Sequence, residues 1–104
     1  MKVFLDDIRS PLSADGYNPA EWIVARTARS AFNLVMTGKV TEISLDHDLG
    51  DGPTGYDLLN WIEKKVFSGD LVNVPRFRVH SYNPVGRERM HKAIKSIENL
   101  IEGR

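Results

Sequence analysis

The sequence contains no cysteine, which excludes disulfide bonds and thiolate metal sites as sources of stability. Its 14 basic and 14 acidic residues cancel, so no net charge attracts nucleic acid or an anionic membrane surface. No DNA-binding surface is evident, and any contact with nucleic acid has to be local. The lack of cysteine fits a reducing compartment, and we expect the protein to be cytoplasmic.

Long apolar segments are also missing. No run approaches the roughly 20 apolar residues of a membrane span. At the N-terminus, only three apolar residues precede Asp6, so we expect no signal peptide there. The length of 104 residues predicts one domain, covering residues 1–104, with one modest core. Residues 101–104 read like a protease-recognition sequence, but they continue the helical pattern before them, and we treat them as native.

The hydrophobic pattern predicts alternating strands and helices. Short β-branched or alternating runs predict strands at residues 2–5, 22–26, 41–46 and 76–81. Apolar residues at helical spacing, with capping residues and glycines at the ends, predict helices over residues 27–38, 54–68 and 84–101. Residues 9–20 are rich in proline, glycine and small polar residues, which predicts a long loop after the first strand. Loops of this length in a compact domain are usually functional, and its position favours a lid.

Strands that alternate with helices imply parallel pairing with right-handed crossovers. The simplest arrangement is a three-layer α/β fold with a four-stranded parallel sheet in the order 2-1-3-4. Along the fourth strand, Phe77 and Val79 alternate with arginines and His80, which is typical of an edge strand with one wetter face. Such an edge permits pairing with a second copy as a homodimer.

Polar side chains gather where three of these strands end. They are Asp6 and Asp7, then Asp46 and Asp48, then His80, Ser81 and Asn83. In open α/β sheets, ligands bind outside the carboxyl ends of the strands, so we expect these side chains to face one crevice. Crowded carboxylates repel each other unless they bind a hard cation or share a proton. The cation expected here is Mg²⁺, or Mn²⁺ in its place.

An anion site is expected beside this cation site. The turn over residues 83–86 opens a helix whose free amides can bind phosphate, and Gly86 allows a ligand to approach the backbone. Arg87 can add a charge-assisted contact to the same anion. Taken by itself, each part also has a purely structural explanation. Asp6 and Asp7 could be acidic residues of an exposed turn, and Asn83 could serve only to cap the helix. The convergence of three strand ends is what favours a functional site.

With these residues laid out, the chain resembles the receiver domain of response regulators. Asp6 and Asp7 look like that family's metal-binding acidic pair, Asp46 like its phosphate-accepting aspartate, and Ser81 like its switching serine or threonine. A receiver also has a helix between its first two strands and a fifth strand preceded by a lysine. The chain has a loop in place of that helix and no counterpart of the lysine, which argues against ordinary phosphorelay signalling.

A narrower resemblance covers nearly the whole chain. Residues 5–9, 44–50 and 80–86 look like the motifs of cyclic-phosphate processing receiver domains. The resemblance implies the processing of cyclic phosphates, such as 2′,3′-cyclic RNA ends, in RNA repair or phage–host conflict. The partner would then be a nucleotide or an RNA terminus carrying a cyclic phosphate.

The leading hypothesis from the sequence is a metal-dependent phosphoesterase of the cyclic phosphodiesterase type. Asp6, Asp7 and Asp46 would hold the cation, with Asp46 as ligand or nucleophile. Asp48 would orient water or complete the metal shell, and His80 would act as general acid or base.

Phosphate contacts are expected from the residues Arg9, Arg26, Ser81, Asn83 and Gly86. The loop would close over the nucleotide, with Tyr17 available to stack on a base. Two alternatives stay open: a module that binds a nucleotide or phosphorylated partner without cleaving it, and a phosphoacceptor signalling domain.

Overall fold

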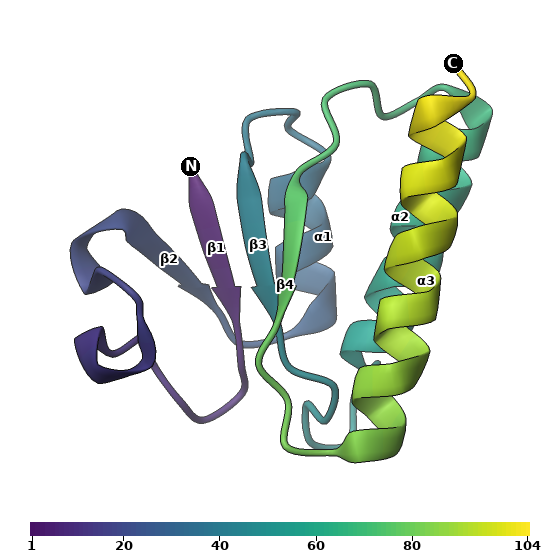
Figure 1. Cartoon of the computed structure of the whole chain (residues 1–104). Coiled ribbons are helices and arrows are strands. Elements are labelled where there is room, and N and C mark those ends of the chain that lie inside the picture. Colours follow the sequence, from purple (N-terminus) through teal and green to yellow (C-terminus); the bar gives the residue numbers. More distant parts are fainter.

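The computed structural model describes residues 1–104 and contains one sheet of four strands, three α-helices and two short 3-10 helices. The strands are β1 (Lys2–Leu5), β2 (Trp22–Ala25), β3 (Glu42–Leu45) and β4 (Arg76–Val79). They lie in the order β2-β1-β3-β4, and all three pairings are parallel (Figure 1). The predicted parallel sheet of order 2-1-3-4 is therefore confirmed, and β4 is an edge strand as expected.

The three helices are α1 (Ala28–Val35), α2 (Gly55–Ser68) and α3 (Pro84–Glu102). Each begins at a capping side chain that accepts a hydrogen bond from a backbone N–H of the first turn. Thr27 and Asn83 cap α1 and α3, while Thr54 and Asp57 form a reciprocal capping box on α2. Gly69 ends α2 with a φ of 83°, a left-handed conformation that favours glycine. No helix is long and apolar enough to cross a membrane.

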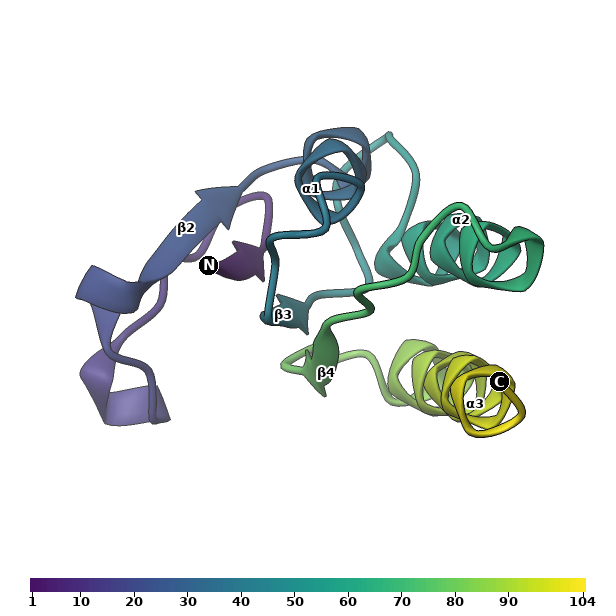
Figure 2. The ribbon, with the colours of Figure 1, turned by 90° about the horizontal axis from the view of Figure 1, so that it is seen from above.

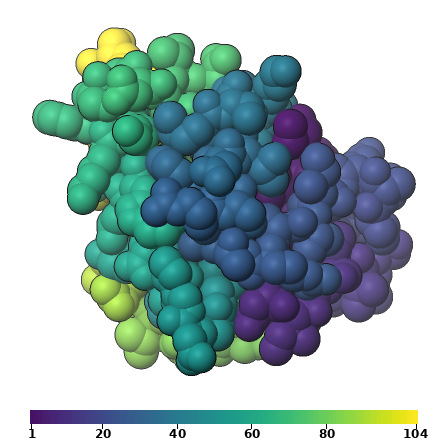
Figure 3. Space-filling view, turned by 180° about the vertical axis from the view of Figure 1, so that it is seen from behind, coloured from purple at the N-terminus to yellow at the C-terminus, as the bar shows by residue number.

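All three helices lie on one side of the sheet (Figure 2). Because strand side chains alternate between faces, Val3 and Leu5 of β1 and Ile43 and Leu45 of β3 point to this side and are fully buried with the helices. Seen from behind, α1 and α2 lie over the sheet (Figure 3). The main hydrophobic core is therefore the layer between the sheet and the three helices.

The opposite face of the sheet is covered by an irregular segment, residues 10–21, which includes the 3-10 helices Ser13–Asp15 and Pro19–Glu21. Its Tyr17 packs edge to face against Phe4 of β1 and Trp22 of β2, with ring centroids 5.1 Å away in both cases. These three aromatic residues form a second, small core. The third layer of the predicted fold is thus this segment and not a layer of helices.

Substitutions of Tyr17 test how this segment is anchored. Tyr17→Ala removes the ring from the aromatic core and should lower the free energy of unfolding by about 3 kcal/mol or more. Tyr17→Phe keeps the ring and removes only the hydroxyl, which is hydrogen-bonded to Ser44, so a loss of about 1 kcal/mol is expected. Urea denaturation of both variants measures the difference. Equal losses would show that the ring contributes nothing beyond its hydroxyl.

Candidate functional site

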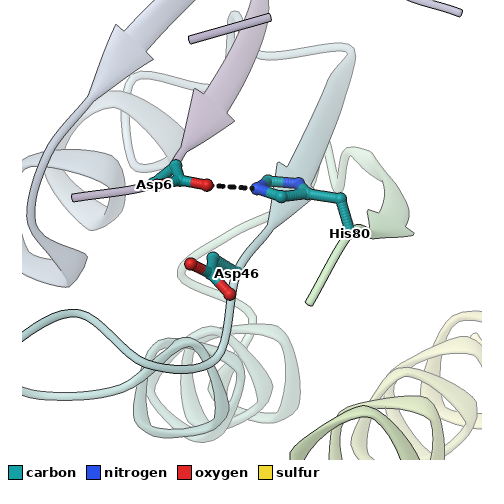
Figure 4. A group of neighbouring side chains, drawn as sticks. All are labelled: Asp6, Asp46 and His80. Atoms are coloured by element: carbon teal, nitrogen blue, oxygen red, sulfur yellow. Dashed lines mark hydrogen bonds and ion pairs between the residues drawn. The ribbon is translucent and has the colours of Figure 1, made fainter. Parts of the chain in front are cut away.

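The carboxyl ends of β1, β3 and β4 meet at one edge of the sheet, as the sequence predicted. Asp6, Asp46 and His80 are the first residues after these strands, and their backbone N–H groups extend the pairing by donating to Ala25, Leu5 and Leu45. One ligand atom from each of the three side chains lies within 4.8 Å of the others. Figure 4 shows Asp6 and His80 facing each other, with Asp46 beside them. We call the three residues the strand-end cluster.

Asp6 is the most buried member, with only 1% of its surface exposed. Its Oδ1 accepts hydrogen bonds from the backbone N–H groups of Ile8 at 2.9 Å and Arg9 at 2.7 Å. Its Oδ2 forms an ion pair with Arg9 Nε at 2.9 Å and accepts a hydrogen bond from His80 Nε2 at 3.2 Å. Burial alone would raise the pKa of Asp6, but these donors and the charge of Arg9 hold it below the ordinary 3.8. Asp6 is therefore an ionised carboxylate that its neighbours compensate well.

His80 is the inner member of a chain of hydrogen bonds. Its Nδ1 lies 2.7 Å from Ser44 Oγ, which lies 2.7 Å from the Tyr17 hydroxyl, and its ring stacks on Phe4 at 4.2 Å. Because the ionised Asp6 can only accept, the proton belongs on Nε2, and Ser44 then donates to Nδ1. Burial lowers the pKa of His80 below 6.5 in spite of the neighbouring Asp6. The imidazole is therefore neutral at pH 7, with both nitrogens engaged.

Asp46 is far less well compensated than Asp6. Its Oδ1 accepts from the backbone N–H of His47 at 2.9 Å, but its nearest cationic atom, Arg9 Nη2, is 3.7 Å from Oδ2. Burial, followed by the negative charge of Asp6, raises the pKa of Asp46 above 3.8. The cluster therefore contains one well-compensated carboxylate and one whose single ion pair, with Arg9, is long.

This donor set fits a divalent cation. Carboxylate oxygens are the ligands that Mg²⁺ prefers, and an imidazole nitrogen beside them is equally compatible with Mn²⁺. A cation between Asp6 and Asp46 would add positive charge at Asp46, whose one ion pair, with Arg9, is long. Asp6 and Asp46 are thus the candidate ligands on structural grounds, and His80 lies beside them as a hydrogen-bond donor through Nε2.

Asp7 and Asp48 follow the same strands but are not members of the cluster. The carboxylate of Asp7 forms no hydrogen bond or ion pair and lies beside Gly50, with Oδ2 3.8 Å from the position of an added Cβ there. Asp48 is exposed and accepts from His47 Nδ1 at 2.9 Å and from Asn83 Nδ2 at 3.3 Å. These contacts, the one from His47 foremost, lower the pKa of Asp48. Asp48 therefore links the end of β3 to the start of α3.

Gly86 does not leave room for a ligand at the start of α3. A Cβ at this position would lie 2.5 Å from the ring of His47, so the imidazole occupies the space that the glycine opens. The same loop approaches α2, where a Cβ on Gly55 would overlap the carbonyl oxygen of Asp46. The two glycines therefore allow both helices to pack closely against the loop that carries Asp46.

The other expected phosphate contacts are engaged within the protein. Ser81 is buried and its Oγ accepts from the backbone N–H of Asn83, while the Asn83 amide oxygen caps α3. Arg26 donates through Nη1 to the carbonyl oxygens of Asp6 and Arg9, at 3.2 and 2.6 Å. Arg26 thereby holds the backbone that follows β1 in the conformation that surrounds Asp6. The structure brings Ser81 close to the cluster and gives Arg26 and Asn83 supporting contacts.

A pocket of about 650 Å³ opens beside the cluster, between the end of β4 and the segment after β1. Its lining residues are Phe4, Arg9, Ser10, Leu12, Asp15, Tyr17, Arg78, Val79, His80, Ser81, Tyr82 and Arg87. Tyr82 is 84% exposed, and the guanidinium of Arg9 lies 4.5 Å from the centroid of its ring. Tyr17 is buried instead, so the expectation that it stacks on a base is wrong. Tyr82 is the aromatic side chain that a ligand can reach.

Sequence reasoning missed Ser44, Arg78 and Tyr82. A signal for the first two existed in the strand alternation, because the sheet register aligns Phe4, Ser44 and Arg78 across three strands. Residues aligned in this way face the same side of the sheet. The hydrogen bond from Ser44 to His80 could not be found in this way, because it depends on where the chain turns after β4.

Comparison with known proteins gives a family match. The sequence model of the family described as Cyclic-phosphate processing Receiver domain matches residues 1–96 of the 104. The matched region contains every residue of the strand-end cluster and of the pocket. No curated protein and no solved structure gives a significant match.

Folding shifts the pKa values of Asp46 and Asp48 in opposite directions, so replacing each with asparagine should change the stability of the cation-free protein in opposite directions. Because the pKa of Asp46 is raised on folding, its contribution to stability is present below pH 3.8 and is lost as the pH rises through the folded-state pKa. Asp46→Asn should therefore raise the melting temperature in EDTA at pH 7, and the gain should vanish below pH 3.8.

Asp48→Asn is the matched comparison, because the pKa of Asp48 is lowered on folding. Its ionised form contributes stability above pH 3.8, which is lost as the pH falls through the folded-state pKa. This variant should melt at a lower temperature than the wild type at pH 7. Thermal melts of the three proteins across this pH range make the measurement. A lower melting temperature for Asp46→Asn in EDTA would contradict the account of the cluster.

Proposed function

The chain belongs to the family of cyclic-phosphate processing receiver domains, and on this premise we propose that it is a metal-dependent phosphoesterase acting on cyclic phosphates. The observation that carries the proposal is the strand-end cluster, in which Asp46 lies beside the ionised Asp6 and has only a long ion pair, 3.7 Å, with Arg9. A site of this kind gains most from a divalent cation and an anionic ligand bound together.

The proposed reaction opens a five-membered cyclic phosphate ester of a nucleotide or RNA terminus. Water adds to phosphorus, one of the two ring P–O bonds breaks, and the released ribose oxygen takes up a proton. The product is a phosphate monoester on the other ribose oxygen. A divalent cation at Asp6 and Asp46 would polarise the phosphoryl oxygens and offset the charge that develops on them.

Three side chains have groups directed at the place where the phosphate would lie. Arg9 uses Nε on Asp6 and Nη2 on the His80 carbonyl, which leaves Nη1 for a phosphoryl oxygen. His80 holds its proton at Nε2, on the cluster side of the ring, where it can orient a phosphoryl oxygen or the leaving ribose oxygen. Asp46 either shares the cation or attacks phosphorus itself, which would give an aspartyl phosphate that water then hydrolyses.

Asp48 is assigned a positioning role within this proposal. Its hydrogen bonds with His47 and Asn83 connect the residue after Asp46 to the cap of α3. Loss of these bonds would shift the loop that carries Asp46 and would not remove a group that touches the substrate. Asp7 is exposed enough to join the cation through water, in keeping with the habit of Mg²⁺ of retaining several waters.

The proposal is tested with purified protein and a panel of nucleoside 2′,3′-cyclic phosphates. Hydrolysis is expected with Mg²⁺ or Mn²⁺ and none with EDTA, and Asp46→Asn should lower kcat by roughly 100-fold or more. Asp70→Asn, an exposed residue outside the cluster and pocket, serves as the control. Hydroxylamine trapping of an acyl phosphate decides between the two roles of Asp46.

The rival functions predict different results in the same assay. A binding module would raise the melting temperature with nucleotide but release no product. A phosphoacceptor domain would incorporate phosphate from a small acyl phosphate donor at Asp46 and leave cyclic phosphates intact. Absence of turnover with every substrate and both metals, in folded protein, would exclude the phosphoesterase.

Tyr82 provides a second prediction, because its exposed ring beside Arg9 is a platform for a nucleobase. Base stacking on an aromatic side chain contributes roughly 1–3 kcal/mol, so Tyr82→Ala should raise KM by about 10-fold or more. Tyr82→Phe keeps the platform and should leave KM close to that of the wild type. Steady-state kinetics of the two variants make the comparison. A similar loss in both variants would assign the effect to the hydroxyl and not to stacking.

A further inference from the structure

The pocket beside the strand-end cluster contains more positive charge than a single cyclic phosphate requires. Three of its lining residues are arginines, and Asp15 is its only lining carboxylate. Arg9 is already bound to Asp6 and to the His80 carbonyl. The charge that remains for a ligand comes from the other two arginines of the lining, Arg78 and Arg87.

Both of these arginines have N–H groups free for a ligand. Arg87 uses Nη1 to donate to the carbonyl oxygen of Ser81 at 3.0 Å, and its other N–H groups form no hydrogen bond. Arg78 forms no hydrogen bond, and its only ion pair is a long one, from Nη1 to Glu42 at 3.8 Å, which leaves Nε and Nη2 for a ligand. A guanidinium in this state can bind a phosphate through two parallel hydrogen bonds.

Arg78 is also held in position before any ligand arrives. Its guanidinium lies 4.4 Å from the centroid of the Tyr17 ring and 5.7 Å from that of Trp22. Tyr17 is fixed in turn by its hydrogen bond to Ser44 and by packing in the aromatic core. Stacking restricts the planar group and lowers the entropy that binding would otherwise remove.

We propose that this pocket binds a second phosphate of the substrate, at Arg78 and Arg87, on the 5′ side of the nucleotide whose cyclic phosphate lies at the strand-end cluster. The assignment rests on the proposed function, since the cluster defines where the cyclic phosphate lies. A volume of about 650 Å³ is within the range of nucleotide-sized ligand sites. The preferred substrate class is then a nucleotide with a 5′ phosphate group, as in an RNA chain that ends in a cyclic phosphate.

Three substrates that share one base separate the sources of this phosphate. They are a nucleoside 2′,3′-cyclic phosphate with a free 5′ hydroxyl, the same compound with a 5′ phosphate, and a dinucleotide that ends in the cyclic phosphate. Both compounds with a second phosphate should have a kcat/KM about 10-fold or more above that of the first, because hydrogen bonds to charged groups are strong. A gain for the dinucleotide alone identifies the RNA chain as the source, and equal gains identify the phosphate itself.

Variants assign this preference to the pocket. The preference is the kcat/KM of the compound with a 5′ phosphate divided by that of the compound with a free 5′ hydroxyl. Arg78→Gln and Arg87→Gln should each reduce this ratio by about 5-fold or more, and Arg78→Lys, which keeps the charge, should restore part of it. Arg76→Gln is the matched control, since Arg76 is an exposed arginine on the same face of β4 that does not line the pocket. Melting curves establish that each variant is folded. A loss with Arg76→Gln equal to that with Arg78→Gln would overturn the assignment, because it would reflect overall charge.

A binding measurement separates this inference from the proposed function. Fluorescence anisotropy with a labelled oligonucleotide that ends in a cyclic phosphate reports affinity whether or not the end is hydrolysed. If no substrate is hydrolysed but Arg78→Gln weakens binding of the oligonucleotide about 10-fold, the phosphoesterase fails and the phosphate site stands. If all three substrates are hydrolysed with equal kcat/KM, the phosphoesterase stands and the second phosphate site is wrong.

Discussion

The buried carboxylate of Asp6 is the interaction on which the rest of the site depends. It accepts three hydrogen bonds, two from the backbone after β1 and one from His80, and it forms an ion pair with Arg9. An ionised group that is 1% exposed would be strongly destabilising without such partners. The same bonds fix the turn after β1, the guanidinium of Arg9 and the tautomer of His80. The geometry of the turn after β1 and of the end of β4 is therefore set by one charge.

The stronger compensation of Asp6 is the reason why we assign the reactive role to Asp46 in the proposed function. Arg9 reaches Asp6 at 2.9 Å but remains 3.7 Å from Asp46, so the positive charge is shared unequally. Burial, followed by the negative charge of Asp6, raises the pKa of Asp46. A buried carboxylate that lies near another one and has only a long ion pair is disposed toward metal binding. The asymmetry follows from the position of Arg9 three residues after Asp6, in the turn that Asp6 itself organises.

The sheet order, the helix caps and the meeting of three strand ends were predictable because they depend on local patterns and on the rules of parallel sheets. The hydrogen-bond chain from Tyr17 through Ser44 to His80 was not, since it joins three segments whose side-chain directions depend on packing. The same limit applies to Gly86. Its sequence context suggested space for a ligand, whereas the ring of His47 fills that space. A glycine in a sequence indicates that another group can lie close to the backbone, but only the structure shows which group does.

The one-sided placement of the helices accounts for the pocket. Residues 10–21 cover the face of the sheet opposite the helices, and they do so with one aromatic anchor and two short 3-10 turns. A regular helix in this place would need an apolar stripe against the sheet, yet this face carries Ser44, Arg78 and other polar side chains. A short irregular segment can bury Tyr17 and leave the end of β4 open. The polar face of the sheet and the irregular cover are thus two parts of one arrangement, which places guanidinium groups beside the carboxylates of the cluster.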